Sequence, residues 1–109
     1  MDGLSDTTRQ TSEQFEVERE DVSGGGRFFI RLPEGLEAEM TYRTIAAAEI
    51  AIDHTFTPPQ FRGRDIALCL MKRCIADARR EGLRIRPLCS YAVVQFRRHP
   101  DWSDVLVQP

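Results

Sequence analysis

The stretch IAIDHTFTPPQFRGRDIALCLMKRCIADARREG, from Ile50 to Gly82, contains the change of hydrophobic period that determines the fold class. Up to Phe56 apolar and polar residues alternate, which is typical of a half-buried β-strand, and Pro58-Pro59 ends it. From Gly63 to Glu81 the apolar residues recur at helical spacing, and Gly82 is placed as a C-terminal cap. The apolar stripe consists of Ile66, Ala67, Leu70, Met71, Cys74, Ile75 and Ala78. The stretch therefore predicts a strand followed by an amphipathic helix.

The residues before this stretch predict further strands. Short alternating or apolar runs at 15–19, 28–32, 37–45 and 49–56 indicate an antiparallel meander. The segment 23–26 is expected to be a flexible break, and 33–35 a turn. Alternation places two sets of side chains on common faces: Ala38, Met40, Tyr42 and Thr44 in one strand, and Ile50, Ile52, His54 and Phe56 in the next.

The residues after the helix complete the predicted architecture. A short strand at 83–88 makes a βαβ crossover, Ser90 caps a second helix at 91–98, and His99-Pro100 ends that helix. A short helical tail anchored by Trp102 follows. The fold class is α/β (α+β mixed), an antiparallel β-meander followed by a helix, a parallel strand and a C-terminal helix. We expect residues 1–14 to be a disordered tail and 15–109 to form one domain.

Composition narrows the classes of function. The 109 residues carry a net charge of -2, which argues against generic nucleic-acid binding, and Lys72 is the only lysine. No apolar run approaches the roughly 20 residues of a membrane span, and three cysteines are an odd number. Neither CxxC nor HxxxH spacing occurs, so no metal site is expected. We expect a cytoplasmic protein without a metal, a nucleic-acid partner or a membrane partner.

The junction between strand and helix carries the strongest chemical signal. A glycine before a helix lets a ligand approach the unpaired N–H groups of the first turn, and Arg62 and Arg64 flank Gly63. The junction is therefore a candidate pyrophosphate site. On spacing alone, a turn that carries solvated arginines is the more common interpretation.

Gln60-x-x-Gly63 before a helix resembles the Q/R-x-x-G-x-G/A signature of the GNAT superfamily of N-acetyltransferases. Three stretches together are similar to a family of small single-domain GNAT-like proteins, with the match extending from Gly26 to Val105. They are Ile52-Asp53-His54-Thr55 leading to Pro59 and Arg62-Gly63, then Ile66-Ala67, and then Pro87-Leu88-Cys89-Ser90-Tyr91 ending at His99-Pro100. The resemblance implies an acetyl-CoA-dependent N-acetyltransferase with a GNAT-like fold, CoA or acetyl-CoA as co-substrate, and an amine acceptor of unknown identity.

The resemblance also implies roles for individual residues. The CoA pyrophosphate would bind the backbone of Arg62, Gly63, Arg64, Asp65, Ile66 and Ala67. Pantetheine would run along the strand end at His54, Thr55, Phe56 and Thr57, and Cys89 would lie near the thioester. Transfer would be direct, or would pass through an acetylated Cys89. His54 is either a hydrogen-bonded core histidine or a general base, and alternation places Asp53 on the opposite face.

Asp65 departs from this signature, because Gly or Ala usually occupies its position. A carboxylate there repels a diphosphate, and at the start of a helix it is expected to occupy the donors that CoA needs. A non-catalytic CoA-binding or protein-interaction module is therefore the alternative. A third hypothesis is a thiol enzyme that uses Cys89 and His54. A deep acceptor pocket would need a partner or a second copy of so short a chain, and an exposed sheet edge makes a homodimer reasonable.

Overall fold

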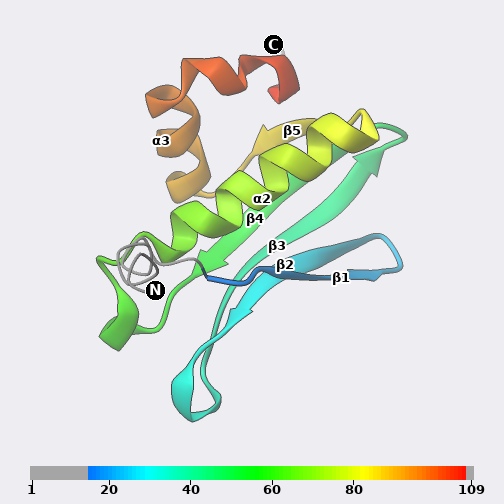
Figure 1. Cartoon of the computed structure of the whole chain (residues 1–109). Coiled ribbons are helices and arrows are strands. Elements are labelled where there is room, and N and C mark those ends of the chain that lie inside the picture. The colour runs from blue at the N-terminus through cyan, green and yellow to red at the C-terminus, as the bar shows by residue number, and fades with distance from the viewer. Residues whose placement is uncertain (1–14, 108–109) are drawn as a thin grey trace, which may run out of the picture.

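The computed structural model describes residues 15–107 and places five strands in one sheet, in the order β1-β2-β3-β4-β5 (Figure 1). The strands are β1 Glu18–Val22, β2 Gly25–Arg31, β3 Glu37–Ala46, β4 Glu49–Phe56 and β5 Arg84–Pro87. Successive strands from β1 to β4 pair antiparallel with one another, and β5 pairs parallel with β4. The helices are α2 Ile66–Glu81 and α3 Ser90–Arg98, with 3-10 turns at Pro33–Gly35, Pro59–Phe61 and Pro100–Val105. The predicted fold class and element order are confirmed, whereas the expected tail 1–14 lies outside the described residues.

The first hairpin differs from its prediction because its turn sets the strand bounds. Val22 pairs with Gly25, which leaves a two-residue connection in which Gly24 has a φ of 83°. The strand predicted at 15–19 therefore begins three residues later, while Phe15 and Val17 pack against the core. Gly25 and Gly26 are not a flexible break, because both lie in β2 and pair with β3.

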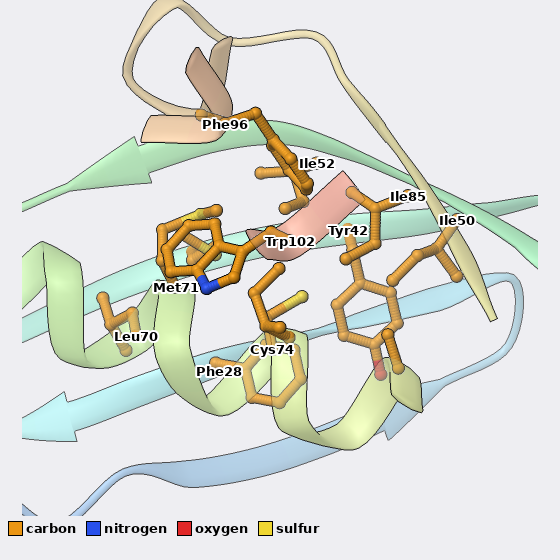
Figure 2. Close-up of a cluster of buried hydrophobic side chains, with 14 of the residues drawn as sticks. Phe28, Tyr42, Ile50, Ile52, Leu70, Met71, Cys74, Ile85, Phe96 and Trp102 are labelled. Atoms are coloured by element: carbon orange, nitrogen blue, oxygen red, sulfur yellow. The ribbon is translucent and has the colours of Figure 1, made fainter. Parts of the chain in front are cut away.

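The hydrophobic core lies between the sheet and the two helices. Ile66, Leu70, Met71, Cys74, Ile75 and Ala78 of α2 are buried, as the helical stripe predicts. Ala92 and Phe96 of α3 and Trp102 of the last turn belong to the same cluster, and Figure 2 shows Trp102 and Phe96 among the side chains of the sheet and α2. Helix α2 ends where predicted, because Gly82 adopts a φ of 70° and Leu83 N–H returns to the carbonyl of Ala78.

A buried acid ties the first strand to α2. The side chain of Asp77 is 3 % exposed and accepts hydrogen bonds from Arg19 at 2.9 Å, Arg73 at 3.1 Å and Arg80 at 2.6 Å. Burial opposes ionisation of Asp77, but these three guanidinium groups outweigh it and hold its pKa below the usual range of an aspartate. The cluster fixes one edge of the sheet to the helix that covers it.

A β-bulge in β4 changes which side chains share a face. Thr41 pairs with His54 but Tyr42 pairs with Ile52, so Asp53 is an additional residue. The alternation expected from Ile50 to Phe56 therefore holds only through Ile52. Asp53 contacts Thr41 Oγ1 at 2.5 Å and Arg43 at 3.3 Å, and His54 Nε2 lies 3.9 Å from Glu39, so both turn toward the same face. The core position expected for His54 is therefore wrong, as is the common face expected for Phe56 with Ile50 and Ile52. Thr44, expected on one face with Met40 and Tyr42, is also exposed.

The face of the sheet away from α2 carries charged side chains paired across strands. Arg27 contacts Glu20, Glu37 and Glu39, Arg31 contacts Glu18, and Arg86 contacts Glu49. Phe29 is only 2 % exposed on this face because Arg27 and Arg31 lie over its ring, at 4.0 and 5.5 Å from the centroid. In the ion pairs of residues 15–107 every cation is an arginine, apart from His54.

Candidate functional site

A cavity of about 700 Å³ opens between the end of β4, the first turn of α2 and one side of α3. It brings together residues that are far apart in the sequence. Those lining it are Thr55, Phe56, Thr57, Phe61, Arg62, Gly63, Asp65, Ile66, Ala67, Leu68, Tyr91, Gln95, Arg98 and His99. A cavity of this size is in the range of small-molecule and cofactor sites.

Two residues in left-handed conformation shape the loop at the start of α2. Gly63 has a φ of 84° and Asp65 a φ of 60°, so the helix begins at Ile66, three residues later than predicted. Asp65 occupies the N-cap position, but its side chain makes no capping hydrogen bond. The expectation that its carboxylate occupies the helix donors is therefore wrong. The N–H groups of the first turn, which have no intrahelical acceptor, stay available to a ligand.

The parting of β4 from β5 forms another wall of the site. The two strands pair only from Glu49 with Arg84 to Ile52 with Pro87. The carbonyl of Ile52 then accepts the N–H groups of Leu88 at 2.9 Å and Cys89 at 3.3 Å, and the chain turns into α3. Beyond Ile52, β4 pairs with β3 alone among the described strands. Its other edge can therefore pair with an extended ligand.

The two candidate catalytic residues lie outside the cavity lining. Cys89 stands at the N-cap position of α3, half-buried, with its Sγ 3.4 Å from Oγ1 of Thr55, which does line the cavity. His54 points to the charged face of the sheet, where its side chain is 55 % exposed. The two residues therefore do not form a pair. This geometry gives no support to a thiol enzyme in which His54 activates Cys89.

Most of the cofactor-binding candidates do line the cavity. Apart from His54, nine residues were candidates, and eight of them are there; they are Thr55, Phe56, Thr57, Arg62, Gly63, Asp65, Ile66 and Ala67. Arg62 Nε donates to the carbonyl of Thr57 at 3.0 Å, which joins the strand end to the loop. Arg64 is the exception, because its guanidinium lies over the ring of Phe61, 5.4 Å from the centroid.

Helix α3 contributes residues that the sequence analysis did not assign to the site. Tyr91, Gln95 and Arg98 are spaced so that they form one stripe along α3, and all three line the cavity. Burial raises the pKa of Tyr91 to about 12, and the carboxylate of Asp65 contributes to the shift. His99 also lines the cavity and stacks on Trp102, with 3.9 Å between ring centroids. The sequence did hold a signal for these residues, because Tyr91, Gln95 and Arg98 recur at helical spacing next to the apolar positions Ala92 and Phe96.

Two further findings concern metal binding and membrane spanning. Within residues 15–107 no group of three or more histidine, cysteine or acidic side chains is arranged to hold a metal ion. Over the same residues, no helix is both long enough and apolar enough to cross a membrane.

Comparisons with known proteins agree with this geometry. The family described as GCN5-related N-acetyl-transferase matches residues 27–105. The solution structure of a GCN5-like protein from Staphylococcus aureus superposes with a TM-score of 0.65 at 28% sequence identity, covering 89% of this chain and 92% of that one. No curated protein matches the chain. The family and the fold support N-acetyltransferase activity, and the chain belongs to the GCN5-related N-acetyltransferase family.

Proposed function

We propose that the chain is an acetyl-CoA-dependent N-acetyltransferase and that the cavity between β4, α2 and α3 binds CoA. The observation that carries the proposal is the meeting, in one cavity, of the unpaired edge of β4 with the first turn of α2. Membership of the family supports the same ligand. The odd number of cysteines in the sequence, three, supports a reducing, cytoplasmic setting.

The two walls of the cavity suit different parts of CoA. The positive φ of Gly63 exposes backbone N–H groups at the start of α2, where Arg62 adds a positive charge, and such a site suits a pyrophosphate. The strand end at Thr55 to Thr57 offers backbone groups to the extended pantetheine arm. CoA would then lie with its phosphates at α2 and its thioester toward the point where β4 and β5 part.

The chemistry requires one bond to form and another to break. The nitrogen of a neutral amine attacks the carbonyl carbon of the acetyl thioester, and the C–S bond then breaks to release the CoA thiolate. That thiolate takes up a proton, and the nitrogen loses one. Tyr91 is protonated at neutral pH because its pKa is about 12, so its phenol can donate to the thiolate.

The residues that accept the proton and the acetyl group are part of the proposal. His54, exposed near the bulge of β4, is the candidate base for an amine that approaches from the charged face. Cys89 is the candidate for a covalent route, in which its sulfur accepts the acetyl group before the amine does. The contact between Cys89 and Thr55 connects this thiol to the cavity.

A non-catalytic CoA-binding or protein-interaction module is the second candidate. The position of Asp65 favours it, because a carboxylate in the cavity lining opposes a phosphate ligand. Self-acetylation or slow hydrolysis of acetyl-CoA, without turnover of any amine, would support this candidate.

Isothermal titration of the chain with CoA and acetyl-CoA tests the proposal. We expect micromolar binding, and we expect the Gly63→Glu variant to lose it while remaining folded, because a Cβ at Gly63 meets no atom within 4 Å and the strain of a side chain at a φ of 84° costs only about 1–2 kcal/mol. Gly35→Glu is the matched control, since Gly35 has a φ of 75°, has equally open surroundings and does not line the cavity. Binding retained by a folded Gly63→Glu variant would contradict the site. An amine screen with Cys89→Ala and His54→Ala would then separate the two chemical routes.

A further inference from the structure

Two exposed apolar side chains, Phe56 and Leu88, flank the point where β4 and β5 part. Phe56 is 41% exposed and Leu88 is 49% exposed. Phe56 pairs with Glu39, whose carboxylate contacts Arg27 on the charged face, the face of the sheet away from α2. Because residues opposite each other in an antiparallel pair lie on the same face, Phe56 belongs to the charged face as well.

Leu88 reaches the charged face from the other side of the parting. In β5 the side chain of Arg86 contacts Glu49 on this face, and Pro87, opposite the core residue Ile52, follows on the other face. Alternation therefore returns Leu88 to the charged face, in agreement with its exposure. Its N–H donates to the carbonyl of Ile52 at 2.9 Å, which holds it beside the last residue of β4 that pairs with β5.

A candidate base lies on the same face beside this apolar pair. His54 precedes Phe56 by two residues, its side chain is 55% exposed, and its Nε2 lies 3.9 Å from Glu39. An apolar surface next to a base complements a primary amine that is attached to an apolar stem. The stem covers the apolar side chains, and the nitrogen lies toward the base and the proposed thioester.

The charges around the pair determine what such a stem can carry. Glu39 contacts Arg27 at 3.1 Å, and Asp53 contacts Arg43 at 3.3 Å. Because both carboxylates already have a guanidinium partner, a second positive charge on the stem would compete with an arginine for either of them. An uncharged hydrocarbon stem meets no such competition and removes apolar surface from water on Phe56 and Leu88.

We infer that Phe56 and Leu88 bind the stem of the acceptor, and that the acceptor is a primary amine on an unbranched, uncharged aliphatic stem. The inference rests on the proposed function, since it needs a thioester at the parting of β4 and β5. Phe56 also lines the cavity, whereas Leu88 does not. Leu88 is therefore the residue at which binding of the acceptor can be separated from binding of CoA.

Steady-state kinetics of the Leu88→Ser variant test this assignment with acetyl-CoA and three amines: ethylamine, n-pentylamine and 1,5-diaminopentane. For the wild type we expect kcat/KM to be about tenfold higher for n-pentylamine than for ethylamine, equivalent to about 1.4 kcal/mol. The value for 1,5-diaminopentane, which has the same stem and a second charge, is expected to be lower than that for n-pentylamine.

Leu88→Ser is expected to lower kcat/KM for n-pentylamine about fivefold, through a higher KM. The value for ethylamine and the affinity for CoA in a calorimetric titration are expected to stay unchanged. Val22→Ser is the matched control, because Val22 is an apolar side chain that is 65% exposed at the end of β1 and does not line the cavity. It is expected to leave all three amines unaffected.

Other outcomes would overturn the assignment in distinguishable ways. Equal kcat/KM for ethylamine and n-pentylamine, or the wild-type selectivity in the Leu88→Ser variant, overturns the inference alone. Faster turnover of 1,5-diaminopentane than of n-pentylamine would overturn the uncharged stem. A loss shared by ethylamine, or a loss of CoA affinity, would mean that Leu88 supports the fold or the cavity. Should Leu88→Ser not fold, Leu88→Ala tests the same contact.

Failure of the proposed function gives a different result. If the wild-type chain binds CoA but acetylates none of the three amines, the transferase activity and the inference fail together while the CoA site stands. If it does not bind CoA, the proposed site fails as well.

Discussion

Asp65 is the residue whose replacement we expect to improve CoA binding. Its carboxylate lines the cavity, and no capping hydrogen bond from the helix stabilises its charge. Replacement by asparagine removes the charge and keeps a residue type that tolerates the left-handed conformation at a φ of 60°. The variant therefore isolates the electrostatic effect from the conformational one.

The expected gain follows from the charges involved. Two unit charges about 6 Å apart in water repel each other by about 0.7 kcal/mol, so a pyrophosphate with about two charges and Asp65 repel by about 1.4 kcal/mol without salt. At physiological ionic strength the Debye length of about 8 Å roughly halves this energy. We expect Asp65→Asn to bind CoA about threefold more tightly at physiological salt, and about tenfold more tightly at low salt.

Titration calorimetry at two salt concentrations measures both values. Asp65→Gly is expected to give the same gain without loss of Tm, because glycine adopts positive φ without steric cost. Glu34→Gln is the control, since Glu34 is exposed, also has a positive φ of 65° and lies outside the cavity lining. If the Asn and Gly variants bound CoA no more tightly than the wild type, or if their gain did not depend on salt, the carboxylate would not oppose the ligand and the reasoning would be refuted.

Three further changes test other parts of the structure. Tyr91→Phe is expected to lower kcat about 100-fold with little change in KM for acetyl-CoA, since it removes a proton donor; steady-state kinetics with an unchanged kcat would exclude that role. Asp77→Asn is expected to lower the free energy of unfolding by about 1.5–3 kcal/mol at pH 7, measured in urea, because three partly exposed arginines lose hydrogen bonds to a charged, buried partner. The folded-state pKa of Asp77 is depressed, so its contribution is present above pH 4 and is lost as the pH falls through that pKa; an equal cost at pH 3 and pH 7 would contradict this. Gly25→Ala is expected to lower the free energy of unfolding by about 1–3 kcal/mol, because a Cβ there collides with the backbone carbonyl of Tyr42; thermal unfolding at the wild-type Tm would show that β2 and β3 can separate to accept it.

The sequence predicts those parts of the fold that depend on local pattern. The stripe from Ile66 to Ala78 and the cap at Gly82 identify α2, and alternation identifies β3 and most of β4. The bulge at Asp53 is not predictable in this way, because an additional residue in one strand is defined only by its pairing with the other. For this reason the expected face of His54 was wrong, and with it the expectation that Asp53 and His54 lie on opposite faces, although the strand itself was found.

The same distinction applies to the candidate site. The wall formed by Thr55 to Ala67 is continuous in the sequence, so its loop and glycine could be recognised before the structure was known. The wall formed by Tyr91, Gln95 and Arg98 depends on how α3 docks beside the start of α2, which no local pattern encodes. Nor does spacing reveal that the polar residue Gln95 is buried, because burial is a tertiary property.

The use of arginine in the ion pairs has a chemical consequence for a protein that would hold an activated acyl group. Lysine amines are targets of acetylation, which removes their charge, whereas guanidinium groups stay protonated and are poor nucleophiles. With Lys72 as the only lysine, exposed on α2 and outside the ion pairs described above, stray acylation has almost no side-chain amine to modify. The charge pairs that fasten the strands to one another and to α2 would therefore be chemically inert toward the donor that the cavity is proposed to bind.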